Sequence, residues 1–172
     1  MLRSPAEDDL FVVEGQELPL SGAAMLELLV AVLDRGVPFR FKAKGFSMSP
    51  FVKDGDVITV ISLRNSLPRL GDVVAFRHPV SERLVVHRVV RVGQDGCLIR
   101  GDAVPEGDGL VPMANIFGRV SRVERNGRPV RLGMGPERAL VAFVTRSGLF
   151  LHVIIPFWML IRPIVRPNRR SV

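Results

Sequence analysis

Short runs rich in β-branched residues, separated by turns that contain glycine or aspartate, constrain the fold of this chain most strongly. The runs are FRFKAK, DVITVIS, DVVAFR, LVVHRVVRV, GCLIR and NIFGRVSRVE, and the turns between them include KDGD, LPRLGD, HPVSER, GQDG and VPEGDG. In FRFKAK, apolar and basic residues alternate strictly, as in a strand with one buried face. Many short strands of this kind indicate a mainly β fold, a coiled antiparallel domain over residues 37–133.

The segments that flank this domain have a different character. Residues 1–20 are expected to form a flexible lead-in, and residues 21–36 an amphipathic helix that Ser21 caps and Gly36 ends. Such a helix would either pack on the β domain or lie on a membrane surface. Its broad apolar face is expected to consist of Met25, Leu28, Leu29, Val32 and Leu33.

The positive charge of the chain is concentrated at its C-terminal end. The net charge is +7, and residues 138–172 hold six arginines and no acidic residue. This stretch is also strongly apolar, whereas a DNA-binding face more often carries its basic residues on a polar helix. The composition therefore favours a membrane surface as partner, and we expect no nucleic acid.

An apolar, Arg-flanked segment at 137–166, followed by a basic tail at 167–172, is the candidate for membrane association. Its clean apolar run, 148–161, is shorter than the roughly 20 residues that a spanning helix needs. A longer run from residue 139 includes Arg146, which would cost about 3 kcal/mol near mid-depth. We expect an apolar helix that lies in or dips into the interface; a buried helix pair, a dimer contact and a true span are the alternatives.

The single cysteine, Cys97, excludes a disulfide within one chain and a zinc site built from several cysteines. We expect it to be a buried strand residue, and we expect neither a metal nor another cofactor. The start of the chain, MLRSPAEDDL, is acidic and lacks the basic and apolar regions of an export signal.

Ser47, in the stretch GFSMSP, is the candidate nucleophile, and a serine hydroxyl needs a neighbouring base. Of the three histidines, His87 lies in LVVHRVV on the strand face of Val85 and Val89, where a core histidine bonded to a carbonyl is the alternative. His78 is expected to be solvated in the polar turn RHPVSER, and His152 to have a packing or interfacial role in the apolar tail.

Two aspartates, Asp102 and Asp108, follow in the glycine-rich stretch RGDAVPEGDG. A carboxylate beside His87 would fix the tautomer of the imidazole and stabilise its charged form, as in a Ser-His-Asp triad. Either aspartate fits this role, and ordinary turn chemistry is the alternative for both.

Six stretches of the chain, taken in order, resemble the ordered boxes of the type I signal peptidase family. They are GFSMSP, KDGDVITV, LGDVVAF, VVHRVV, RGDAVPEGD and IFGRV. The resemblance covers residues 39–120 and is greatest to the ER and archaeal-type branch, in which His replaces a Lys base. It implies a serine endopeptidase on a β-rich fold that cleaves leader or signal peptides after small residues. The implied residues are Ser47 as nucleophile, His87 as general base, Asp102 and Asp108 at the two acidic positions, and Met48 in the substrate pocket.

The same resemblance implies an extended peptide or preprotein substrate beside a sheet edge, with Val85 and Val89 suited to shallow pockets. The backbone N–H of Ser47 is the expected oxyanion donor. Many family members carry a second serine two residues before the nucleophile, and this chain has Gly45 there.

The family's membrane helix before the nucleophile is also missing, because 21–36 is short and contains acidic residues. We therefore expect the C-terminal segment to provide membrane association, at a prokaryotic inner membrane with the side left open. A cytoplasmic protein is the alternative location. A non-catalytic or regulatory peptide-binding module that kept the fold is the alternative function, whereas a self-cleaving repressor would need a DNA-binding domain and a Lys base.

Overall fold

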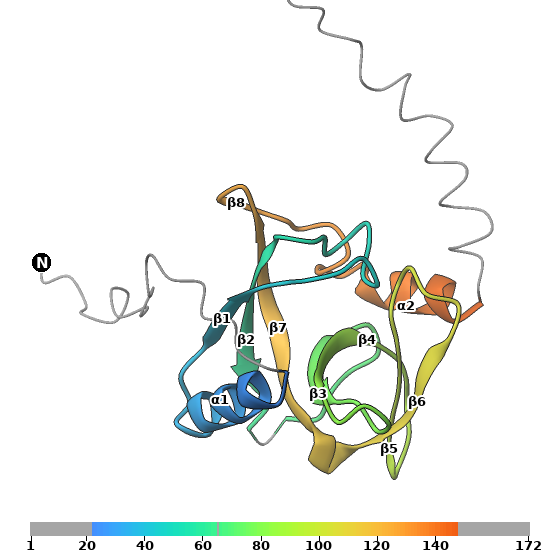
Figure 1. The fold of residues 1–172 in the computed structure, drawn as a ribbon. Coiled ribbons are helices and arrows are strands. Elements are labelled where there is room, and N and C mark those ends of the chain that lie inside the picture. Colours follow the sequence, from blue (N-terminus) through green and yellow to red (C-terminus); the bar gives the residue numbers. More distant parts are fainter. Residues whose placement is uncertain (1–21, 65, 148–172) are drawn as a thin grey trace, which may run out of the picture.

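The computed structural model describes residues 22–64 and 66–147, which form a mainly antiparallel β-sheet with two α-helices (Figure 1). This confirms the mainly β character predicted from the strand runs. The elements are α1 (Gly22–Asp34), β1 (Phe39–Lys42), β2 (Val57–Ser62), β3 (Val73–Arg77), β4 (Leu84–Val92), β5 (Gly96–Arg100), β6 (Gly107–Pro112), a short 3-10 turn (Met113–Asn115), β7 (Ile116–Arg125), β8 (Arg128–Pro129) and α2 (Arg138–Ser147).

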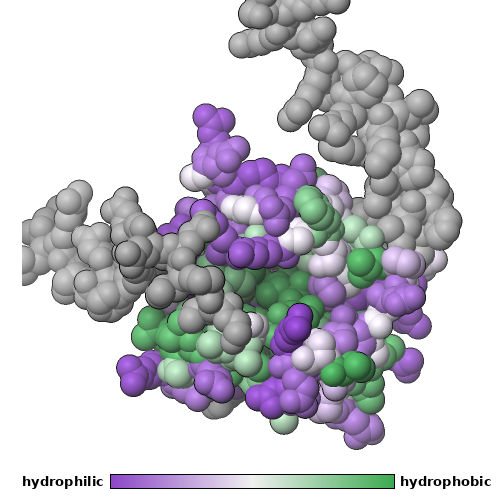
Figure 2. Space-filling view, in the orientation of Figure 1, coloured by the Kyte–Doolittle hydropathy of each residue, from purple (hydrophilic) through white to green (hydrophobic). Residues whose placement is uncertain are grey.

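One sheet contains all of these strands, in the order β1-β2-β7-β3-β4-β5-β6, with β8 paired to β7. Every pairing is antiparallel. The sheet is strongly coiled, so that β1, β2 and β7 lie with α1 on one side of the molecule and β3 to β6 lie on the other, near α2 (Figure 1). On the face of the molecule drawn in Figure 2, apolar residues lie over α1 and at the centre, and hydrophilic residues lie around them.

β3 lies in the middle of the strand order, and both of its faces are buried. Val73 and Ala75 belong to a first core cluster with residues of α1, β2 and β7, which we call core 1. Val74 and Phe76 belong to a second cluster with residues of β4, β5 and β6, which we call core 2. A strand buried on both sides needs a continuous apolar run, which explains the sequence VVAF.

The predicted helix at 21–36 is confirmed from Gly22 onward, and it packs on the sheet through Leu29 and Leu33 in core 1. Gly36 has a φ of +76° and donates its N–H to the Leu33 carbonyl at 2.9 Å, which ends the helix as predicted. The prediction for Leu28 was wrong, because its side chain is 44% exposed while Leu26 is buried. Adjacent helical residues lie about 100° apart, so Leu28 falls outside the row that Leu29 defines.

β6 is a strand in a stretch that the sequence analysis assigned to a turn. It pairs with β5 through Cys97↔Val111, Ile99↔Gly109 and Arg100↔Gly107. Glycine and aspartate are rare in strands, which is why the first three residues of β6 were assigned to the turn VPEGDG. Cys97 is buried on β5 as predicted, and this burial raises the pKa of its thiol, with a further contribution from the charge of Asp72.

α2 lies within the predicted segment 137–166, and residues 148–172 lie outside the described residues, as do residues 1–21 with the predicted cap Ser21. The helix packs on β4 and is held by an ion pair between Arg138 and Asp72 at 3.1 Å. Ala142 and Thr145 are buried, whereas Leu140 and Phe143 are exposed. None of the helices in the described ranges has the length and hydropathy needed to cross a membrane.

Candidate active site

Ser47 lies in a tight turn that is fixed to the core by the residues that follow it. The carbonyl of Met48 accepts hydrogen bonds from the N–H groups of Phe51 and Val52, at 3.1 and 3.0 Å. Met48 and Val52 are buried in core 1. The core therefore holds the turn through Met48 and Val52, and Ser47 itself is half-buried.

His87 contacts the Ser47 hydroxyl. It lies in the middle of β4, opposite Val74 of β3, and its Nε2 is 2.8 Å from Ser47 Oγ. The imidazole is nearly buried, and its ring centroid lies 6.3 Å from that of Phe76 in core 2. The sheet thus places the nitrogen of a well-packed imidazole within hydrogen-bond distance of a hydroxyl 40 residues away in sequence.

Asp108 lies behind the imidazole. Its Oδ2 is 2.7 Å from His87 Nδ1. The pairing of β5 with β6 shifts here, because Ile99 faces Gly109 and Arg100 faces Gly107, which leaves Asp108 as the extra residue of a β-bulge. Such bulges redirect a side chain, and Gly109 accommodates the distortion with a φ of +79°.

The two contacts define the proton positions on His87. The Asp108 carboxylate accepts a hydrogen bond from Nδ1–H of His87, which leaves Nε2 free to accept a hydrogen bond from the hydroxyl of Ser47. This is the arrangement in which an imidazole removes the proton of a serine during attack on a carbonyl.

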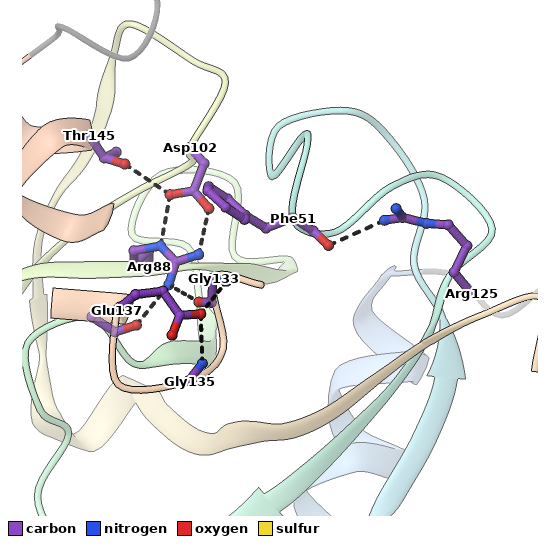
Figure 3. A network of polar contacts seen from close by, with 9 residues as sticks. Phe51, Arg88, Asp102, Arg125, Gly133, Gly135, Glu137 and Thr145 are labelled. Atoms are coloured by element: carbon purple, nitrogen blue, oxygen red, sulfur yellow. Dashed lines mark hydrogen bonds and ion pairs between the residues drawn. The ribbon is translucent and has the colours of Figure 1, made fainter. Parts of the chain in front are cut away.

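Asp102 does not contact His87, and Figure 3 shows its partners, Arg88 and Thr145. Its two oxygens accept from Nε and Nη2 of Arg88, both at 2.8 Å, and Oδ1 also accepts from the Thr145 hydroxyl of α2 at 3.1 Å. Asp102 and Arg88 are 1% and 0% exposed. Of the two acidic positions predicted from sequence, the structure therefore brings Asp108 to His87 and uses Asp102 in a buried ion pair.

The Arg88–Asp102 pair joins three parts of the chain beneath the site (Figure 3). Arg88 Nη1 donates to the carbonyls of Gly71 and Gly133, at 2.9 and 2.8 Å. Its guanidinium also lies 5.3 Å from the ring centroid of Phe51, in the turn that follows Ser47. Every polar atom of the pair thus has a partner, which a buried charge pair requires for stability.

The loop that contains Asp102 packs directly on the nucleophile. The N–H of Ala103 donates to the carbonyl of Ser47 at 2.8 Å. A Cβ atom at Gly101 would lie 2.7 Å from the same carbonyl oxygen and 3.1 Å from His87 Nε2, so only glycine fits there. Asp102 therefore supports the site indirectly, by holding this loop against Ser47.

An ion pair at the start of β2 fixes the other side of the nucleophile turn. Arg125 donates to both oxygens of Asp56, at 2.8 and 2.7 Å, and the N–H of Lys53 donates to the same carboxylate. Burial alone would raise the pKa of Asp56, but these hydrogen bonds and the two positive charges outweigh it and lower the pKa.

The backbone N–H of Ser47 is the expected oxyanion donor. It donates to no other residue in the described part of the chain. Gly45 has a φ of +94°, and a Cβ atom there would meet nothing within 4 Å. A left-handed backbone favours glycine, which accounts for its presence where the family often has serine.

The residues expected in the substrate pocket lie mainly beneath the site. Met48 is 5% exposed and Val89 is 0% exposed, so both belong to the cores, and Val85 is half-buried against core 2. Across the ranges that the structure describes, no cluster of three or more His, Cys, Asp or Glu side chains could hold a metal ion.

Sequence reasoning missed two residues near the site. Arg88 directly follows the candidate base on β4, so strand alternation places it on the opposite face from His87, where it pairs with Asp102. His78, expected to be solvated, has its Nε2 3.5 Å from Asp108 Oδ1. No sequence signal linked that turn to β6, because the two meet only through the sheet.

Comparison with known proteins assigns no family to this chain. Models of protein families give no match to the sequence, and a search of curated proteins gives none either.

Proposed function

We propose that this protein is a serine endopeptidase of the signal-peptidase type, with Ser47 as nucleophile, His87 as general base and Asp108 as the residue that orients it. The observation that carries the proposal is the continuous chain of contacts from Ser47 Oγ through both nitrogens of His87 to Asp108, at 2.8 and 2.7 Å. The order of the sequence boxes that contain these residues supports the signal-peptidase type.

The reaction would proceed by acyl transfer. His87 Nε2 takes the proton as Ser47 Oγ attacks the peptide carbonyl, and the resulting oxyanion lies near the N–H of Ser47. The protonated imidazole, stabilised by Asp108, then gives its proton to the leaving amine. Water, deprotonated by His87, hydrolyses the acyl-enzyme and restores the free serine.

The proposed substrate is an extended peptide or preprotein segment with small residues at the cleavage site. β6 is the last strand in the order of the described sheet and carries Asp108, so a peptide could pair near it by strand addition. The preference for small residues rests on the resemblance of the sequence boxes to those of the signal peptidase family.

We further propose that the protein associates with a membrane surface, at a prokaryotic inner membrane, through 137–166. α2 supports this, because Leu140 and Phe143 are 66% and 64% exposed one turn apart. Arg146 is exposed in the last turn of the same helix, which suits the anionic interface of a bilayer.

A matched pair of leader peptides tests the proposed specificity. Full-length protein in vesicles of anionic lipid is incubated with a leader that ends in Ala-X-Ala and with the same leader carrying Leu at the last position. We expect cleavage after the small residue, mapped by mass spectrometry, with kcat/KM at least about 10-fold lower for the Leu peptide.

Two results would oppose this proposal. Equal cleavage of both peptides would contradict the proposed substrate class. Binding of leader peptides without turnover would favour a peptide-binding module over an enzyme.

A further inference from the structure

The carboxylate of Asp108 lies between two histidines. Its Oδ2 is 2.7 Å from Nδ1 of His87, and its Oδ1 is 3.5 Å from Nε2 of His78. The ring of Phe76 packs near both imidazoles, with centroid separations of 6.3 Å to His87 and 6.5 Å to His78. Each oxygen of the acidic residue therefore faces its own imidazole.

The turn after β3 fixes the proton position on His78. Its Nδ1 accepts from the backbone N–H groups of Val80 and Ser81, at 3.3 and 3.1 Å. Because Nδ1 accepts, the ring proton of a neutral His78 must be on Nε2, the nitrogen that faces Asp108. The backbone of His78 also bonds to Arg83 and Glu82, so the turn holds the ring from both sides.

Within the described residues, the polar partners of the Asp108 carboxylate are the two imidazoles. Asp108 is the extra residue of a bulge between Gly107 and Gly109 on the last described strand of the sheet. The terminal torsion of an aspartate is broad, so the backbone alone does not select one orientation of the carboxylate. A donor at Oδ1 would leave Oδ2 directed at His87.

We propose that His78 is a positioning residue, which holds the Asp108 carboxylate in the orientation that His87 requires; this rests on the proposed peptidase function. The 3.5 Å separation suits a contact that shortens when substrate binds, as hydrogen bonds in free active sites commonly do. The side chain of His78 is 23% exposed, and that of Asp108 only 9%. A substrate that covers the site would exclude the remaining water.

Two variants, each keeping a polar atom at one ring-nitrogen position, separate this role from simple support of the turn. In His78→Asn, the amide oxygen takes the place of Nδ1 and keeps the turn but cannot reach Asp108. In His78→Gln, the amide nitrogen takes the place of Nε2 and restores the donor. We expect kcat to fall about 10- to 100-fold in the Asn variant and to stay within about 3-fold of wild type in the Gln variant.

Thermal melting of both variants checks that each one folds. A fully active His78→Asn variant would overturn the proposal, and so would a His78→Gln variant as impaired as the Asn variant.

Nitrogen NMR of the imidazoles provides a readout that needs no substrate, so it separates this proposal from the peptidase proposal. In the wild-type protein, we expect the Nε2–H tautomer for His78 and a change in its ring signals in Asp108→Asn. An Nδ1–H tautomer, or His78 signals unaffected by Asp108→Asn, would refute the role of His78 even if no leader peptide is cleaved.

Discussion

Replacing Ser47 by Ala is expected to abolish peptide cleavage, with kcat lowered by a factor on the order of 10⁵ to 10⁶. The variant loses the atom that lies 2.8 Å from His87 Nε2, and no other group would take its place. Because only one half-buried hydroxyl is removed, the melting temperature should change little. The measurement is the rate of leader cleavage under saturating substrate.

The neighbouring Ser49→Ala is the matched control for this variant. It removes a hydroxyl from the same turn, two residues after the candidate nucleophile, and should retain nearly all activity. Substantial cleavage by Ser47→Ala, or loss of cleavage in Ser49→Ala alone, would contradict the assignment of Ser47 as the nucleophile.

Asp108→Asn is expected to lower kcat by about 10⁴ while leaving the fold intact, as the equivalent change does in serine proteases with a triad. An amide at this position can present its N–H₂ to the imidazole and stabilise the tautomer with the proton on Nε2. That tautomer cannot accept the proton of Ser47. The rate constants of purified, folded protein test this expectation.

Asp102→Asn is the matched control, because the same chemical change is made at the other acidic position. It leaves the buried charge of Arg88 without its full partner, a loss that typically costs about 3–5 kcal/mol. We expect a clear fall in melting temperature and a kcat within about 10-fold of wild type for the folded protein. The reverse pattern, with Asp102→Asn inactive but stable and Asp108→Asn active, would instead assign the orientation of His87 to Asp102.

The strand pattern of the sequence was sufficient to predict the mainly β character and most of the strands. β-branched runs between glycine and aspartate turns identified β2, β3, β4, β5 and β7, and alternation identified the inward face of β1. β6 was missed because its pairing with β5 stabilises a stretch whose local preference is for a turn. In α1, the buried residues are Leu26, Leu29 and Leu33, a narrower row than the broad face that periodicity predicted.

The candidate site was predictable up to the choice of the acidic residue. Residue type and order identified Ser47 and His87, which the sheet brings together across 40 residues. Asp102 and Asp108 remained equivalent in the sequence, because a one-residue bulge decides which carboxylate faces the imidazole. The place of His78 depended on the same bulge, so it too lay beyond sequence reasoning.

The most direct test of the central claim, that Ser47 is a nucleophile activated by His87, is to map a covalent adduct. Wild-type protein is treated with a peptidyl phosphonate ester that carries an alanine-like side chain, which reacts with activated serines, and is then digested and analysed by mass spectrometry. We predict one phosphonyl group per chain, attached to Ser47, absent from Ser47→Ala and formed much more slowly in His87→Gln. An adduct on another residue, or labelling of Ser47 at the same rate without His87, would contradict the account.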